Sequence, residues 1–302
     1  MDKCPYSSQH GLALIIVLWM VALISVIASS FAYSMRSELM LARNLVSSSQ
    51  SQALADAGIQ RAMYEMAKPA SDTQRWQANG LRHEFSLAGA KIAVTMRDES
   101  GKIDINTAPD ALLKMVLTSA GMNESQSAMV VDAILDWRDK DDLKRPLGAE
   151  VNDYIAAGFK FRPSNGPFET VEELQHVMGM SPGLYARISE MLTVFSKQPG
   201  FNPAFASRDV LRVVPGMEAS QLDAYLMQRK QNLENGLPAP SFPIVGSYLL
   251  QSSSQIVSVR SEARLADGTL FVRDAVLKAN PSGKQAYLFL RWAEGTVRDT
   301  RN

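Results

Sequence analysis

The chain has 302 residues, and its 31 basic residues balance its 31 acidic ones, so the net charge is zero at pH 7. This balance provides no global attraction to nucleic acid or to acidic lipid. The single cysteine, Cys4, excludes an internal disulfide framework, and three widely spaced histidines give poor support to a zinc site or a catalytic triad.

The first element in chain order is an uncharged run from Leu12 to Met35. A helix over this run reaches roughly 36 Å, enough to cross a hydrocarbon core of about 30 Å. The apolar core of a cleaved signal peptide is usually about 7–15 residues, so the run is longer than is usual for that class. Three interpretations compete: a signal peptide cleaved near Ala28–Ala32, a plain membrane anchor, and a prepilin-type leader cleaved between Gly11 and Leu12.

The helical pattern continues beyond the apolar run until Pro69. Leu39, Ala42 and Leu45 recur at helical spacing, with polar residues between them. We therefore expect one helix over residues 12–68, which begins in the membrane and emerges amphipathic; an anchor followed by a separate helix is the alternative. Gly58 is its one weak position, at a cost of about 1 kcal/mol relative to alanine.

A strand and a helix start are predicted next. Apolar residues alternate over residues 92–96, which indicates a strand. Residues 99–101 predict a turn and residues 103–105 a return strand. Thr107 is the expected N-cap of the following helix, with Asp110 completing a capping box.

The middle of the chain contains a loose repeat of helix, Gly-Met and helix. Its Gly-Met pairs fall at residues 121–122, 179–180 and 216–217, and Asn123 or Ser181 is placed to cap the second helix.

Helix-hairpin-helix motifs that bind DNA phosphates are the functional alternative for these repeats. Such hairpins usually carry a second glycine and a basic residue, whereas this chain has Asn123, Ser181 and Glu218 at the glycine position. Glu124 and Glu218 would repel phosphate. We therefore interpret the repeats as packing units and expect no nucleic acid, with a pilus-associated DNA-uptake subunit as the alternative.

An acidic segment, residues 136–153, is the most suggestive chemically. Hard cations such as calcium take six to eight oxygen ligands, often from one short loop. The spacing does not fit an EF-hand. From the residues alone, a cation site and a solvated loop with basic counter-charges are equally supported. The carboxylates of the segment are Asp136, Asp139, Asp141, Asp142, Glu150 and Asp153.

The carboxyl-terminal region predicts strands after a proline-rich joint at residues 237–243. Alternating runs occupy residues 255–265, 269–279 and 286–295, and Asp267-Gly268 between the first two signals a hairpin. These strands are expected to pair with the early strand region, so that a helical insertion interrupts one antiparallel sheet domain. This arrangement is an α+β fold.

The segment "HGLALIIVLWMVALISVIA" resembles the leader and stem of type IV pilins and type II secretion pseudopilins. Together with "DWRDKDD" and "RPLGAEVNDY", the chain resembles the minor pseudopilin K family. The resemblance implies cleavage by prepilin peptidase between Gly11 and Leu12 and N-methylation of Leu12. Most pilins carry a glutamate at the position of Ile16, and the K family resembles this chain in lacking it. Because Ile16 cannot neutralise the amine of a subunit above, the expected position is the tip of the fibre.

The resemblance also implies an organisation and a set of partners. The expected parts are a leader at 1–11, a transmembrane and stem helix at 12–68, a pilin-like domain at 69–106 and 235–302, and a helical insertion at 107–234. The expected protein is not an enzyme: it is a single-pass inner-membrane subunit with a periplasmic domain, which caps the pseudopilus beside minor pseudopilins I and J and helps to initiate assembly for export of folded proteins. Family members bind calcium in the insertion. Carried over, Asp139, Asp141 and Glu150 are the first expected ligands, and Asp136, Asp142 and Asp153 the second.

Overall fold

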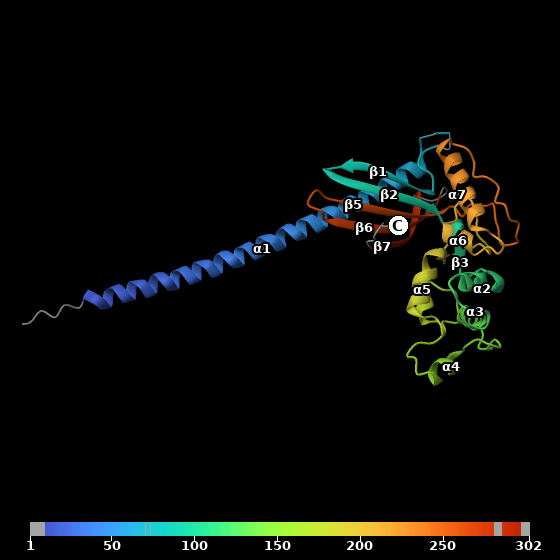
Figure 1. Ribbon diagram of the computed structural model, residues 1–302, viewed down its shortest axis with the longest axis horizontal. Helices are drawn as coiled ribbons and strands as arrows, with labels where there is room; N and C mark the ends of the chain where they lie inside the picture. The colour runs from blue at the N-terminus through green and yellow to red at the C-terminus, as the bar shows by residue number, and fades with distance from the viewer. Residues whose placement is uncertain (1–9, 70, 73, 281–285, 297–302) are drawn as a thin grey trace, which may run out of the picture.

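A long N-terminal helix dominates the shape of the molecule (Figure 1). The computed structural model describes residues 10–69, 71–72, 74–280 and 286–296, with side chains described from residue 13. Helix α1, His10–Ala67, has 58 residues. It is a single helix, as expected, and by length and composition it is able to cross a membrane, a property shared with signal sequences. Its second half lies along the sheet.

The sheet has five antiparallel strands in the order β1-β2-β5-β6-β7. The predicted pairing of the C-terminal strands with the early region is confirmed, because β2 pairs with β5. The predicted hairpin between β5 and β6 is also confirmed, with Gly268 at a φ of +92°. The strands are β1 (Asn79–Leu87), β2 (Ala90–Asp98), β5 (Ile256–Arg264), β6 (Leu270–Ala279) and β7 (Tyr287–Glu294).

Strand β1 was not expected from the sequence. Leu81, His83, Phe85 and Leu87 alternate with polar residues along this strand, but histidine in this series weakens the apolar signal. The tight turn to β2 uses Ala88, whose φ is +48°, a conformation unfavourable for alanine.

The core between α1 and the sheet explains Gly58. Leu54 and Ile59 of α1 are buried against apolar side chains of β2, β5 and β6. A Cβ on Gly58 would lie 2.0 Å from Oγ of Ser261 on β5. The expected weak point of the helix is therefore a position where the helix lies close to β2 and β5, and a larger residue there would displace Ser261 or Ile92.

The helical lobe, residues 110–234, has its own apolar core. The predicted caps are confirmed: Asn123 and Ser181 accept the N–H groups of Gln126 and Leu184. The first helix of the second repeat is a 3-10 helix rather than an α-helix. The elements are α2 (Asp110–Ser119), α3 (Glu124–Arg138), α4 (Val151–Ala156), η2 (Val171–His176), α5 (Pro182–Ile188), η3 (Ser189–Met191), α6 (Arg208–Arg212) and α7 (Ala219–Glu234).

Two expectations about the entry to the lobe are wrong. After the 3-10 turn η1, Glu99–Gly101, strand β3, Ile103–Asp104, does not return along β2 but pairs in parallel with β4, Leu192–Thr193. Thr107 does not cap α2, because its hydroxyl donates to the carbonyl of Gln198, and Pro109 occupies the N-cap position. In both cases a contact with a residue distant in the sequence replaces the local pairing that the sequence pattern predicted.

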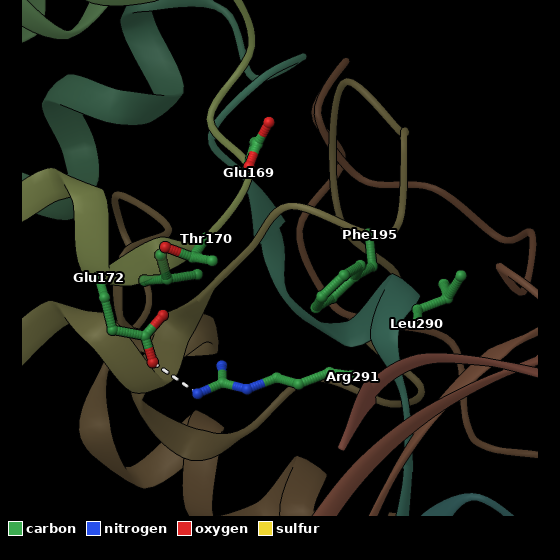
Figure 2. A pocket seen from close by; sticks show the side chains of 7 residues that line it. Glu169, Thr170, Glu172, Phe195, Leu290 and Arg291 are labelled. Carbon is green, nitrogen blue, oxygen red and sulfur yellow. Dashed lines mark hydrogen bonds and ion pairs between the residues drawn. The ribbon is translucent and has the colours of Figure 1, made fainter. Parts of the chain in front are cut away.

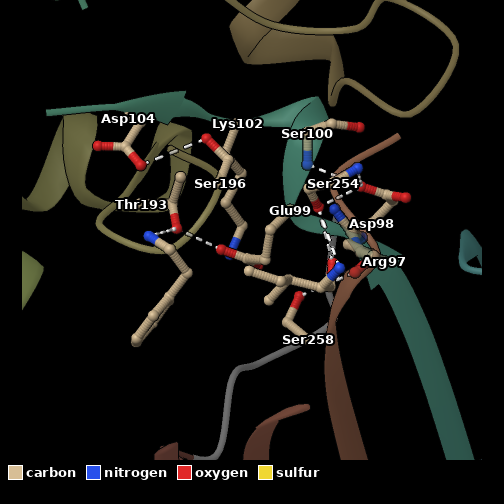
Figure 3. A network of polar contacts seen from close by, with 12 residues as sticks. Arg97, Asp98, Glu99, Ser100, Lys102, Asp104, Thr193, Ser196, Ser254 and Ser258 are labelled. Carbon is tan, nitrogen blue, oxygen red and sulfur yellow. Dashed lines mark hydrogen bonds and ion pairs between the residues drawn. The ribbon is translucent and has the colours of Figure 1, made fainter. Parts of the chain in front are cut away.

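A buried polar network forms this junction between the sheet and the lobe (Figure 3). Asp98 accepts hydrogen bonds from Ser100 and Ser254. Glu99 accepts from Lys102 and from the hydroxyl of Thr193 on β4. Because each carboxylate has protein donors, the network fixes the lobe to the sheet without a buried, unsatisfied charge.

Candidate metal centre

The acidic segment lies between the end of α3 and the start of α4, at the end of the lobe remote from the sheet (Figure 1). Asp136 lies in the last turn of α3, Asp139 is its C-cap residue, and Glu150 is the N-cap residue of α4. The intervening loop, residues 139–149, is called the acidic loop below. It folds back so that both ends face each other.

Asp136 is fully buried, with 0% of its surface exposed. Its carboxylate accepts the N–H of Arg145 at 3.3 Å from both oxygens. Burial raises the pKa of Asp136, and the negative charge of Asp139 raises it further. A Cβ on Gly148 would lie 1.9 Å from Oδ2 of Asp136, so only glycine lets the acidic loop approach this carboxylate.

Glu150 is the least satisfied carboxylate of the segment. Only 6% of its surface is exposed, and neither carboxylate oxygen has a hydrogen-bond partner among the described residues. Burial raises the pKa of Glu150 to about 7, and the nearby charges of Asp136 and Asp139 contribute to the rise. A buried carboxylate without donors is costly unless a proton or a cation neutralises it.

Asp139 and Asn165 add two further unsatisfied oxygens. Oδ1 of each is buried and has no hydrogen-bond partner within the described part of the chain. The amide nitrogen of Asn165 donates to Oδ1 of Asp142 at 2.7 Å, which holds this residue beside the acidic loop. Burial raises the pKa of Asp139, and the charge of Asp141 raises it further. Asp141 itself accepts the N–H of Leu143 at 2.9 Å.

Asp153 has a different role from the other carboxylates. It accepts the backbone N–H of Glu150 at 3.0 Å and forms an ion pair with Lys144 at 2.6 Å. The hydrogen bond from Lys144 lowers the pKa of Asp153. Its oxygens are already occupied, so it supports the start of α4 rather than offering a free ligand.

An aromatic cluster packs beside the acidic segment. Trp137 stacks on Phe168 with ring centroids 6.0 Å apart and lies 5.9 Å from the ring of Tyr154. The hydroxyl of Tyr154 accepts the N–H of Met178 at 2.8 Å. Phe168 is buried, and Thr170 occupies the N-cap position of η2. The cluster restrains both ends of the acidic loop.

The acidic segment offers oxygen donors of the kind that a hard cation takes, but its side chains are not grouped around one point. In the described residues, no three acidic, histidine or cysteine side chains form a group able to hold a metal ion as they stand. However, buried oxygens without donors at Glu150, Asp139 and Asn165 are hard ligands of the type that calcium takes. The burial of Asp136 and Glu150 departs from the alternative, a solvated loop, whereas Asp141 and Asp142 are exposed and Lys144 and Arg145 form ion pairs with Asp153 and Asp136 as that alternative expects.

Sequence reasoning missed two residues of this centre. Asn165 lies outside the acidic segment, and its only signal is the turn dipeptide Asn165-Gly166, where Asn165 has a φ of +47°. Gly148 has no side chain to serve as a ligand, and its role, which is to make room for the carboxylate of Asp136, is visible only in the structure.

The predicted processing residues lie at the start of α1. Gly11 and Leu12 belong to its helical backbone, while residues 1–9, including Cys4, lie outside the described residues. Ile16 is exposed on α1 at 55% of its surface.

The molecule is therefore an α+β protein in which a membrane-length helix supports an antiparallel sheet and a helical lobe with an acidic centre. A family model described as type II secretion system (T2SS), protein K, matches residues 95–197, a range that includes the acidic segment. The predicted resemblance to type II secretion system protein K is confirmed.

Individual proteins agree with this match. Type II secretion system protein K of Klebsiella pneumoniae is 28% identical over 204 residues, which are 60% of this chain and 61% of that protein. The putative type II secretion system protein K of Escherichia coli K12 is 27% identical and is also covered to 61%. The chain thus spans less than two thirds of the length of these relatives. The protein K of Pseudomonas aeruginosa is 24% identical, with 72% of each chain covered.

A solved structure supports the fold. A chain in the crystal structure of the GspK-GspI-GspJ complex from enterotoxigenic Escherichia coli matches with a TM-score of 0.55 and 18% identity. The match covers 87% of this chain and 99% of that chain. The α+β class, with a long helix and an antiparallel sheet, is therefore confirmed.

Proposed function

We propose that this protein is a minor pseudopilin of the type II secretion system, anchored by α1 in the inner membrane with its sheet and lobe in the periplasm. The match to protein K over residues 95–197, on a fold built around a membrane-length helix, carries the proposal. The protein acts by assembly and is not an enzyme. Its partners are the minor pseudopilins I and J and other pseudopilus subunits, in line with the complex in the matching structure.

The proposed position is the tip of the pseudopilus, where the protein caps the fibre and helps to initiate assembly for export of folded proteins. Ile16 supports this position because it offers no carboxylate to a subunit above, and a carboxylate inside the membrane is costly unless it is paired. The helical lobe supports it through its bulk, since it projects from the sheet domain at the end opposite to the free part of α1 (Figure 1).

The proposed maturation is cleavage between Gly11 and Leu12 by prepilin peptidase, followed by methylation of the amine of Leu12. Mass spectrometry of the protein purified from membranes tests this step. We expect a mature chain that begins at N-methylated Leu12, and we expect a Gly11→Leu variant to keep its leader. A chain that begins near residue 30, free of the membrane, would contradict the proposal and support a conventional signal peptide.

The proposed cofactor is a structural calcium ion in the acidic segment. Glu150 and Asp139 are its first ligands because their buried oxygens lack donors, and Asn165 joins them through its neutral side-chain oxygen. Asp141 and Asp142 are further ligands from the acidic loop, and Asp136 supplies an additional negative charge from α3. Bound calcium would supply the positive charge that the cluster lacks and rigidify the acidic loop.

A further inference from the structure

The two edges of the sheet are treated differently. On β1, Arg82 forms ion pairs with Glu84 and, across the sheet, with Glu262 of β5, and a register shift interrupts the start of the strand. Charges and bulges of this kind protect an edge against pairing with another chain. On β7, the opposite edge, large apolar side chains are 39–46% exposed: Leu288, Phe289, Leu290 and Trp292.

The register places these apolar side chains on both faces of β7. Phe289 and Trp292 lie opposite Leu277 and Ala275 of β6, which pack under α1, so both aromatic rings belong to the face of the stem helix. Their ring centroids are 5.2 Å apart in an edge-to-face arrangement. Leu290 falls at the register shift and faces the helical lobe instead.

A cleft of about 250 Å³ separates this part of β7 from the helical lobe (Figure 2). Phe195 and Leu290 line it with apolar surface, and Arg291 crosses it to pair with Glu172 at 2.6 Å. Glu169 lies at the same cleft, and no described residue forms an ion pair with its carboxylate. The cleft therefore offers an apolar floor and one uncompensated negative charge.

We propose that β7 pairs with an extended segment of a neighbouring pseudopilus subunit, which adds a sixth strand to the sheet. No other described strand pairs with the outer side of β7, so its outward N–H and C=O groups are available for a further ladder. An apolar side chain of the added strand enters the cleft between Phe195 and Leu290, and a basic side chain pairs with Glu169. The identity of the neighbour rests on the proposed function; the pairing mode does not.

The experiment compares the full-length protein in detergent, alone and co-purified with co-expressed pseudopilins I and J, by hydrogen–deuterium exchange. We expect the amides of residues 287–294 to exchange at least tenfold more slowly in the complex, because new ladder bonds protect them. The amides of β1 serve as the internal control and should not change. Equal exchange of β7 with and without a bound partner would overturn the inference while leaving the proposed function intact.

A matched pair of edge variants sharpens the test. Leu288→Lys on β7 and Leu87→Lys on β1 replace leucines of similar exposure, 41% and 45%, at opposite edges. We expect Leu288→Lys to weaken the complex at least tenfold and Leu87→Lys to leave it unchanged, with melting temperatures confirming that both variants fold. Equal affinities for the two variants would contradict the inference.

A third variant tests the charge at the cleft. Glu169→Gln should weaken the complex about 2- to 5-fold, in proportion to an exposed ion pair, and should reduce its salt dependence. An unchanged salt dependence would contradict the proposed ion pair between Glu169 and a basic residue of the partner. Concentration-dependent protection of β7 in the chain alone would identify a second copy as the occupant, and failure of any complex to form would overturn both proposals.

Discussion

The junction and the acidic segment both bury carboxylates, yet their surroundings are opposite. At the junction, Glu99 is 1% exposed and accepts hydrogen bonds from Lys102 and Thr193. In the acidic segment, Glu150 is 6% exposed and has no donor among the described residues. Burial alone therefore does not indicate a ligand site. The informative observation is a buried carboxylate that the fold leaves without a partner.

Asp104 extends the comparison. Burial raises the pKa of Asp104, as it does for Glu150, but three donors accompany Asp104: the N–H groups of Asn106 and Lys197 and the hydroxyl of Ser196. A raised pKa is thus common to both clusters. The donors distinguish a carboxylate that is satisfied within the fold from one that the fold leaves without a partner, which is the property expected of a ligand.

Calcium provides the largest expected effect and separates the two clusters directly. At 100 times its dissociation constant, calcium should stabilise the protein by about 2.7 kcal/mol and raise the melting temperature by about 5–10 °C relative to chelator. Calorimetry of the full-length protein in detergent measures this shift. Glu150→Gln should abolish it, whereas Glu99→Gln should keep it. An identical melting temperature with calcium and with chelator would rule out the metal.

Removal of a junction carboxylate should destabilise the protein whether or not calcium is present. Glu99→Ala leaves the buried hydroxyl of Thr193 without its acceptor, and we expect a loss of about 2 kcal/mol. Chemical unfolding with calcium and with chelator should give the same loss. A loss confined to the calcium-loaded protein would show that the junction and the acidic segment are energetically coupled, and it would contradict the separate roles given to them.

The pH dependence of the chelated protein should differ in sign from that of an ordinary carboxylate. The pKa of Glu150 is about 7 in the folded protein against 4.5 for an ordinary glutamate, so the folded state retains a proton that the unfolded state has released. This contribution to stability is complete below pH 4.5 and is lost as the pH rises to about 7. Melting temperatures across this window should fall with pH in the wild type more steeply than in Glu150→Gln.

Calcium should reverse this trend, because it competes with the proton on Glu150. Calcium affinity should therefore fall as the pH drops below about 7. Isothermal titration at several pH values measures it, and proton release on binding near pH 6 is the specific signature. Binding that is independent of pH from 5 to 8 would exclude Glu150 as a ligand.

The smallest expected effects separate Asn165 from Asp153. Asn165→Ala removes a neutral oxygen and should weaken calcium binding about tenfold. Asp153→Asn is its control, because Asp153 is engaged with Lys144 and the start of α4; it should lower stability by about 0.5–1 kcal/mol without changing calcium affinity. The opposite pattern would return Asp153 to the ligand set and remove Asn165.

Local patterns predicted the elements whose cause is local. The uninterrupted run up to Pro69 predicted α1, the Asp267-Gly268 turn predicted the β5–β6 hairpin, and Asn123 predicted the start of α3. The predictions failed where a distant partner decided the outcome. Thr107 was placed as a helix cap, but its hydroxyl donates to the carbonyl of Gln198.

The candidate site divides in the same way. The sequence placed the carboxylates of residues 136–153 in one segment, because they are close along the chain. It gave no indication that Asn165 joins them or that β7 is an apolar edge.

The sequence by itself determined the period of each element, the length of the apolar helix and the concentration of acidic residues. Only the tertiary structure decided which carboxylates lose contact with water and which of those receive donors in exchange. The physical reason is that periodicity and capping act over a few residues, whereas burial and hydrogen-bond satisfaction depend on atoms that the fold brings together from distant parts of the chain.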